Sequence, residues 1–193
     1  MPEDTNSAIL RTATALLREH PFDDVSYRSL ADQVGISERT VFRQFPTRAH
    51  LLEAVAGWID EHEFTPIVFA DLAGFQSAVR AGFHEFDAEP AFAFLTARAA
   101  AMSPTRDAGP SAIARMLEVA VADACPGLNA RDETRAVASL RSFASAQFWA
   151  RMRAAFGLDA AEIGDAFDWS VARTLDALGI QHPAVAPVLG RRA

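Results

Sequence analysis

The stretch Tyr27 to Phe45 reads YRSLADQVGISERTVFRQF, and it decides the fold of the N-terminal region. At its centre stands Gly35, a residue type that adopts the left-handed turn conformation without steric cost. Ala31, four positions earlier, is small enough for two helices to cross closely. This combination predicts a helix-turn-helix unit. The apolar residues expected to hold its two helices against the body are Leu30, Val34, Ile36, Val41 and Phe45.

Burial of Val41 and Phe45 would leave the opposite face of the second helix in solvent. Arginine can bond guanine in two places or pair with phosphate, and glutamine can bond adenine in the same bidentate way. This face therefore suits the major groove of DNA. A solvated amphipathic helix is the alternative, and the spacing of Ala31 and Gly35 argues against it. The residues expected on this face are Arg39, Thr40, Arg43 and Gln44.

Helical periodicity extends over almost the whole chain, and no run alternates with period two, so we predict an all-α protein. Ser7, Ser26, Ser37 and Thr47 are candidate N-caps of the first four helices. We expect those helices to end near Arg18, Val34, Gln44 and His62, with later helices near 71–87, 90–102, 111–124, 131–156 and 160–178. A loop is expected at 103–110, and a loosely ordered tail after Gln181.

The chain is acidic overall, but its charges are unevenly distributed along the sequence. The 193 residues carry a formal charge of −7, and all 18 basic residues are arginine. Between residues 26 and 50, however, there are four arginines and only two acidic residues, a net charge of +2. This excess predicts a local basic patch that could bind a polyanion, and ordinary fluctuation in composition is the alternative. One cysteine, no long apolar run and an acidic start without a signal-peptide pattern predict a cytoplasmic protein with no membrane segment.

The stretch from Phe22 to Val55, FDDVSYRSLADQVGISERTVFRQFPTRAHLLEAV, resembles the DNA-binding domain of TetR-type (tetracycline-repressor-like) transcriptional regulators. The resemblance implies an N-terminal three-helix helix-turn-helix domain at 1–48 and a C-terminal helical bundle at 49–193 for effector binding and dimerisation. It also implies contacts to double-stranded operator DNA. The residues expected to make them are Ser26, Arg28, Ser37, Arg39, Thr40, Phe42, Arg43, Gln44, Thr47 and Arg48.

At three of these positions the residue differs from the one usual in the family's sequence motif. Phe42 stands where tyrosine is common, so a phenolic contact to phosphate is missing; its ring could touch a thymine methyl or brace the helix. Gln44 replaces a common histidine. Arg48 replaces a lysine at the start of the fourth helix and is expected to keep a phosphate contact.

The C-terminal region is expected to bind a small, mainly apolar or aromatic effector and to form a homodimer through the helices at 131–156 and 160–178. The second of these carries an apolar stripe at Ile163, Phe167, Val171 and Leu175, with Gly164 allowing close approach. A monomer core is the alternative use of both helices. Candidate effector contacts are His84, Phe92, Met102, Met116, Phe143, Gln147 and Phe148, although core packing is the simpler role for each apolar one.

The expected function is a ligand-responsive transcriptional regulator, in this family usually a repressor released from its operator by an effector. The alternative is an all-helical small-molecule binding protein whose helix-turn-helix does not read DNA. We expect no catalysis and no cofactor, since no nucleophile elbow or phosphate loop is present. We also expect no metal, since His84 lacks a second histidine at metal-binding spacing.

Overall fold

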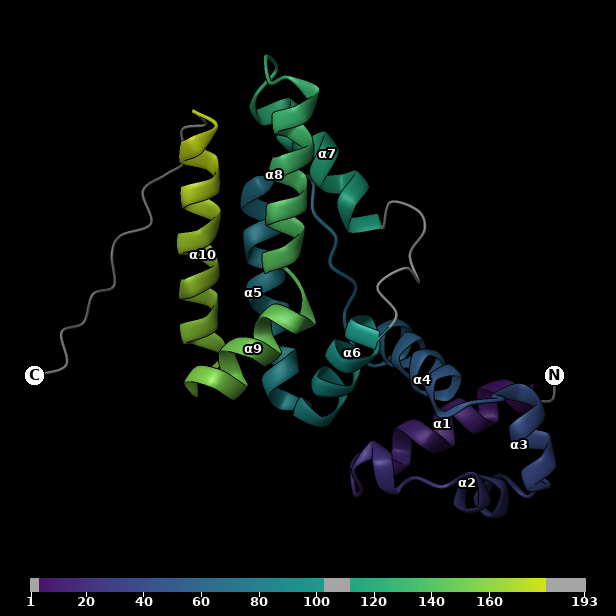
Figure 1. The fold of residues 1–193 in the computed structure, drawn as a ribbon. Coiled ribbons are helices and arrows are strands. Elements are labelled where there is room, and N and C mark those ends of the chain that lie inside the picture. The colour runs from purple at the N-terminus through teal and green to yellow at the C-terminus, as the bar shows by residue number, and fades with distance from the viewer. Residues whose placement is uncertain (1–3, 103–111, 180–193) are drawn as a thin grey trace, which may run out of the picture. The chain divides into compact units, whose positions relative to one another are not determined.

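The computed structural model describes residues 4–102 and 112–179, and every regular element in these ranges is helical (Figure 1). The prediction of an all-α protein is confirmed. The loop expected at 103–110 and the tail after Gln181 lie outside the described residues. The elements are α1 (Thr5–Leu16), the 3-10 turn η1 (Phe22–Asp24), α2 (Tyr27–Val34), α3 (Glu38–Gln44), α4 (Arg48–His62), α5 (Leu72–Ala88), α6 (Pro90–Met102), α7 (Ala112–Ala124), α8 (Ala130–Phe143), α9 (Ala146–Phe156) and α10 (Ala160–Ala177).

Two compact units share the chain. The first combines Met1–Pro66 with Ala88–Arg106, and the second combines Ile67–Asp87 with Asp107–Ala193. The first unit therefore holds α1 to α4 together with α6, which follows them only after α5. This division rests on backbone contacts. The division by role, with DNA binding at 1–48 and effector binding at 49–193, remains a prediction.

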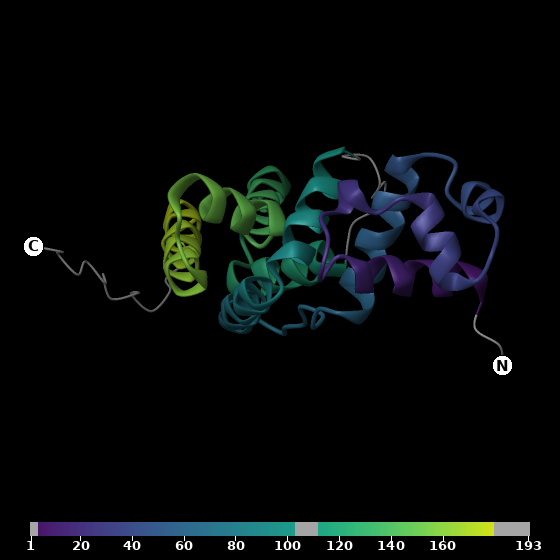
Figure 2. The same ribbon diagram turned by 90° about the horizontal axis from the view of Figure 1, so that it is seen from below.

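The first unit is built around one apolar cluster. α1 packs on α2 and α4, α2 packs on α3, and α4 packs on α6. Seen from below, α1 (purple) runs crosswise to the other helices of this unit (Figure 2). Ile9, Leu30, Val41 and Leu51 are fully buried in the cluster, and Phe92 of α6 closes it. The inward positions predicted on both sides of Gly35 are therefore core residues or packed against the core.

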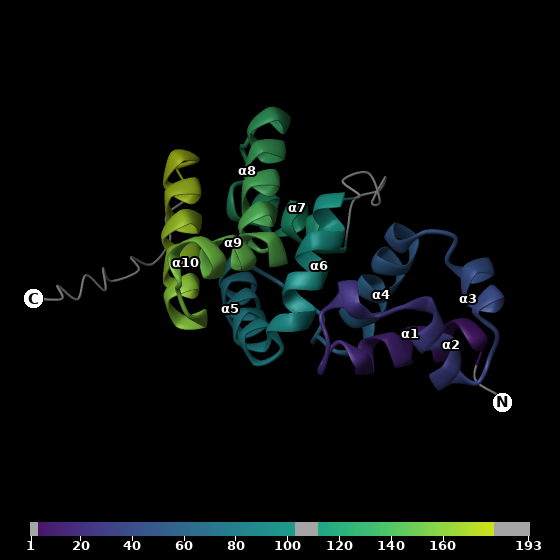
Figure 3. The ribbon, with the colours of Figure 1, turned by 60° about the horizontal axis from the view of Figure 1, so that its bottom comes forward.

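In the second unit, α8 and α10 lie side by side in both labelled views (Figures 1 and 3), and α8 also packs on α7. Aromatic rings fill much of its core. The Phe167 ring of α10 meets the rings of Phe75 and Phe83 of α5 edge-on, with centroids 5.6 and 5.7 Å away. The α10 stripe expected to form a dimer interface, Ile163, Phe167, Val171 and Leu175, is thus buried within a single chain.

Two predicted helix boundaries are wrong. α1 begins at Thr5 after Asp4, so Ser7 lies inside the helix and does not cap it. The single helix expected at 131–156 is two helices, because Ala144 leaves helical geometry and the Ser145 hydroxyl accepts a hydrogen bond from the Phe148 amide. A side-chain cap starts a new helix there, even though the apolar periodicity continues across the break.

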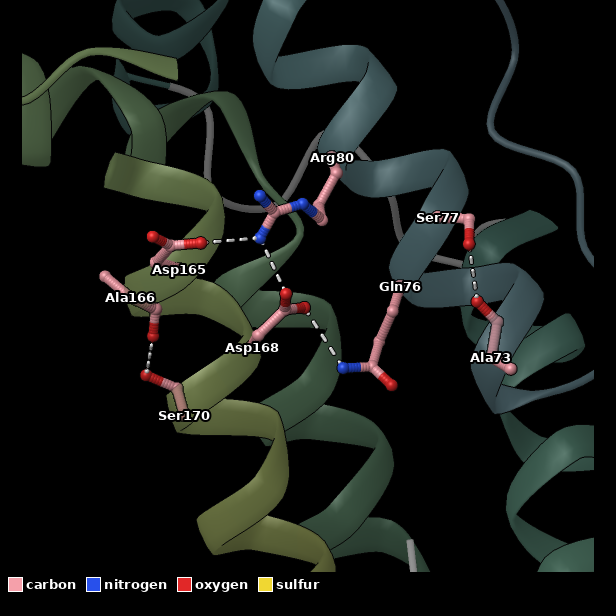
Figure 4. Close-up of polar contacts among 8 residues, drawn as sticks. All are labelled: Ala73, Gln76, Ser77, Arg80, Asp165, Ala166, Asp168 and Ser170. Atoms are coloured by element: carbon pink, nitrogen blue, oxygen red, sulfur yellow. Dashed lines mark hydrogen bonds and ion pairs between the residues drawn. The ribbon is translucent and has the colours of Figure 1, made fainter. Parts of the chain in front are cut away.

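Polar side chains of α5 form hydrogen bonds and ion pairs with α10 (Figure 4). The Arg80 guanidinium donates to Asp165 at 3.1 Å and to Asp168 at 2.6 Å, and Asp168 also accepts from the Gln76 amide at 3.0 Å. A Cβ atom at Gly164 would lie 2.9 Å from the central carbon of this guanidinium. The close approach expected at Gly164 is therefore made by Arg80 of the same chain.

Candidate nucleic-acid interface

The first helix of the helix-turn-helix unit, α2, is fixed at both ends. At its start the Ser26 hydroxyl accepts from the Ser29 amide at 2.9 Å, and the Ser29 hydroxyl accepts from the Ser26 amide, which is a capping box. At its end Gly35 has φ +77°, the left-handed conformation predicted for the turn. The amides of Gly35 and Ile36 both donate to the carbonyl of Ala31, so the chain reverses direction within a few residues.

The second helix, α3, is capped by Ser37, whose hydroxyl accepts from the Thr40 amide at 3.2 Å. Val41 is fully buried and Phe45 nearly so, which fixes the rotation of α3 about its own axis. The Tyr27 hydroxyl donates to the Phe45 carbonyl at 2.8 Å, so the start of α2 holds the end of α3. Burial raises the pKa of the Tyr27 phenol.

As predicted, the buried face of α3 leaves a polar face in solvent. Arg39 and Arg43 are exposed and Gln44 is half-buried. Thr40 is also half-buried, and its hydroxyl shares a hydrogen bond of 2.9 Å with that of Ser37. Phe42 lies on the same side of the helix and remains half exposed. On α2, Arg28 is exposed as well, so the unit presents several cations to solvent.

The N-terminus of α4 lies close to this surface. Thr47 caps it by accepting from the His50 amide at 3.2 Å, and its hydroxyl also meets the His50 ring nitrogen Nδ1 at 2.9 Å. His50, which was not among the predicted contacts, is exposed in the first turn of α4. The amides at this helix start can bind an anion.

Arg48 is half-buried at the start of α4. Its guanidinium donates to the backbone carbonyls of Phe22 and Val25 and lies over the Phe22 ring, 4.3 Å from the centroid. These contacts tie the start of α4 to η1 and to the approach to α2. The structure thus gives Arg48 a structural role. Each terminal nitrogen uses one of its two N–H groups in these bonds, so the phosphate contact expected of Arg48 stays a prediction.

These elements enclose a shallow hollow of about 370 Å³. Two helix starts contribute to it, through the capping side chains Ser26 and Thr47. Acidic groups lie at the same hollow: Glu38, and Asp23, whose pKa is lowered by a hydrogen bond from Arg98. The remaining lining residues are Val25, Tyr27, Phe42, Pro46 and Arg48.

The residues predicted to bind an effector are divided between the two units. Phe92 is buried in the cluster of the first unit, where the Arg18 guanidinium lies over its ring at 4.7 Å. Met102 is exposed at the end of α6. In the second unit, His84 and Gln147 are exposed and Met116 is half-buried. Only Phe143 and Phe148 meet, with ring centroids 5.7 Å apart. That these seven residues bind an effector stays a prediction.

A different hollow, of about 600 Å³, lies between α8 and α10. Phe143 is the one predicted effector contact that lines it. Trp169, which is 66% exposed, forms part of its wall beside Arg135 and Arg173. Both arginines are paired within their own helices, with Asp132 at 2.9 Å and Asp176 at 2.8 Å. Within the described residues, no group of three or more histidine, cysteine or acidic side chains is arranged to hold a metal ion.

Residues 9–55 match the family model of bacterial regulatory proteins of the tetR family. This region is a TetR-family domain. It contains the whole helix-turn-helix unit described above and most of α4. The matched residues include the left-handed turn at Gly35 and the arginine-bearing face of α3.

Two relatives match part of the chain, and one solved structure shares its fold. The chain is 34% identical over 64 residues to a nucleoid occlusion factor SlmA from Marinomonas sp. (strain MWYL1), and over 59 residues to one from Alteromonas mediterranea. These matches span only 32% and 30% of the relatives' lengths. A TetR transcriptional regulator from Rhodococcus sp. RHA1 shares the fold, with a TM-score of 0.59, 16% identity, and coverage of 91% of this chain and 97% of that one.

No helix in residues 4–102 or 112–179 has both the length and the apolar character needed to cross a lipid bilayer.

Proposed function

We propose that this chain is a DNA-binding transcriptional regulator that works as a homodimer, represses its target genes and leaves its operator when a mainly apolar effector binds. The observation that carries the proposal is the outward face of α3. Arg39 and Arg43 are exposed on a helix whose rotation is fixed by buried Val41 and Phe45. A rigid helix with free arginines is the element that reads base edges in the major groove.

Backbone amides at two helix starts would bind phosphates and so position the protein along the DNA. The starts of α2 and α4 present amides beside the capping side chains of Ser26 and Thr47. Phosphate contacts of this kind position a protein on the duplex, while sequence is read by side chains at base edges. The basic surface is small and the whole chain carries a charge of −7, so selectivity must depend on few contacts.

Two features support a homodimer. A dimer doubles these few contacts by placing two recognition helices about 34–36 Å apart, one turn of DNA. In addition, Trp169 of α10 is 66% exposed beside the hollow between α8 and α10. A large exposed aromatic side chain is typical of surfaces that bind a partner. Because the buried stripe of α10 is already used within the chain, the interface would use this other face.

The effector would act from the region 49–193. A ligand shifts a conformational equilibrium only through unequal affinity for the two states, so it must bind better to the form that fits the operator poorly. The spacing of the two recognition helices is the quantity it would change.

A mobility-shift assay on DNA flanking the encoding gene tests the proposal, first in low salt and then in rising salt. Arg43→Ala should relax the sequence preference by about 1–3 kcal/mol if Arg43 reads a base. Arg28→Ala is a control on α2, and it should weaken binding to all sequences alike. Absence of any shift at low salt would favour the alternative, a small-molecule binding protein.

Release of the shifted complex by added compounds then tests the effector. A library of aromatic and aliphatic small molecules should contain members that abolish the shift without unfolding the protein. Light scattering of the free protein measures the mass, and a value for one chain at micromolar concentration would contradict the homodimer.

A further inference from the structure

Phe42 is the apolar residue of α3 that does not face the core. Val41 and Phe45 of the same helix are buried, whereas the Phe42 side chain is 50% exposed. Leaving half of a phenyl ring in water forgoes the stabilisation that burial of an aromatic side chain provides. Contacts within the chain therefore bury only half of the Phe42 side chain.

The ring is nevertheless held in place. It meets the Tyr27 ring edge-on, with centroids 4.5 Å apart and planes inclined by 71°. Tyr27 is itself 7% exposed and is anchored by the hydrogen bond of 2.8 Å from its hydroxyl to the Phe45 carbonyl. An aromatic pair of this geometry is favourable beyond its buried area. Phe42 thus presents a fixed apolar surface.

The surroundings of this surface are polar and partly cationic. Arg39 lies one turn before Phe42 on the same side of α3, and Arg43 follows it. The ring also lines the hollow to which Ser26 and Thr47 contribute their helix caps. If α3 enters the major groove, the exposed part of the ring lies beside Arg39 and Arg43 on the face of α3 that meets the DNA.

A phenyl ring cannot exchange hydrogen bonds with phosphate or with the polar edges of bases. The 5-methyl group of thymine is the apolar group that an unmodified base pair presents in the major groove. We propose that Phe42 is a specificity-determining residue that selects thymine in each half-site by packing on this methyl group. The inference rests on the proposed function, because it requires that α3 bind DNA through its outward face.

The test removes the methyl group alone. Duplexes preferred by the wild-type protein are first selected from a pool with a randomised central 30 base pairs. Each thymine of the winning sequence is then replaced by deoxyuridine, symmetrically in both half-sites, and the dissociation constant is measured. Loss of one methyl contact should weaken binding about fourfold for each half-site, the worth of one buried methylene.

Three variants assign the effect to Phe42. In Phe42→Ala the difference between thymine and deoxyuridine at the sensitive position should disappear. In Phe42→Tyr, which keeps the ring, and in Arg43→Ala, which keeps Phe42, the difference should persist. Circular dichroism confirms that each variant is folded, and the exposed position of Phe42 makes Phe42→Ala a mild change for folding.

The outcomes separate the two proposals. If no duplex is enriched by the wild type, the proposed function fails, and this inference fails with it. If a sequence is selected but every thymine tolerates deoxyuridine within twofold, only the role of Phe42 is overturned. The same holds if Phe42→Ala retains the full thymine preference.

Discussion

Arg48→Ala separates a structural arginine from a DNA-contacting one. Arg48 is the first residue of α4, where a positive charge opposes the helix dipole by about 0.3–1 kcal/mol. The position is stable because the guanidinium donates to two backbone carbonyls, of Val25 and Phe22, and lies over the Phe22 ring. Removal of the side chain leaves both carbonyls without this donor.

The magnitude follows from these contacts. Hydrogen bonds from a charged donor contribute about 1.5–3 kcal/mol each, and partial solvent exposure lowers the pair to about 2–3 kcal/mol in total. The contact with the ring adds about 0.5–1 kcal/mol. Relief of the dipole conflict offsets part of this sum. Arg48→Ala should therefore lower the free energy of unfolding of the first unit by about 2 kcal/mol.

Arg48→Lys is the matched control, because it keeps the charge but cannot span both carbonyls. It should lose about 1 kcal/mol, through loss of one hydrogen bond and of the planar stacking. Urea unfolding followed by circular dichroism gives the midpoint and slope for each variant. Hydrogen exchange of the α2 and α3 amides shows whether the loss is local to this unit.

Two results for Arg48→Ala would contradict a structural role for this side chain. If Arg48→Ala unfolds at the wild-type urea concentration, with unchanged slope, the two carbonyl contacts do not stabilise the domain. If the same variant also shows a salt dependence of DNA binding reduced by about one ion, then Arg48 contacts phosphate, as the resemblance to the family had implied.

Three further substitutions test other parts of the structure. Gly35→Ala should cost about 1–2 kcal/mol in thermal unfolding; its added Cβ meets nothing within 4 Å, so the cost arises from the positive φ alone, and an unchanged midpoint would contradict it. Tyr27→Phe should cost about 1–3 kcal/mol by leaving the buried Phe45 carbonyl without its donor, and a wild-type urea midpoint would show that water replaces the hydroxyl. Asp168→Asn should destabilise the second unit by about 1–2 kcal/mol, because Arg80 loses its shortest ion pair; stability equal to wild type would assign that role to other contacts of Arg80.

Local chemistry made the helix-turn-helix unit readable from the sequence. The caps at Ser26, Ser37 and Thr47 and the turn at Gly35 depend on residues within three or four positions of one another. The spacing of the apolar residues Val41 and Phe45 then predicted which side of α3 is buried. The break at Ala144 was missed because the apolar period runs through it, and Ser145 was the available signal of a new helix start.

The roles of Arg48 and of the effector candidates depend on tertiary packing, which the local pattern does not contain. Arg48 finds carbonyls that lie 23 and 26 positions earlier in the chain. Phe92 and Phe143 are both bulky and apolar, yet one is in the core of the first unit and the other lines a hollow of the second. Residue type alone does not show which phenylalanine lies in a core and which lines a hollow.

The inclusion of α6 in the first unit bears on how this protein can be divided and recombined. Phe92, Leu95 and Ala99 complete the apolar cluster that α1, α2 and α4 begin, and Arg98 pairs with Asp23 at 3.0 Å. A fragment ending at Pro66 would expose to water the apolar surface on which α6 packs. A hybrid regulator made by exchanging DNA-binding regions therefore needs three junctions, two of them around α5, or a graft in which the recipient's own α6 fits the transplanted helices.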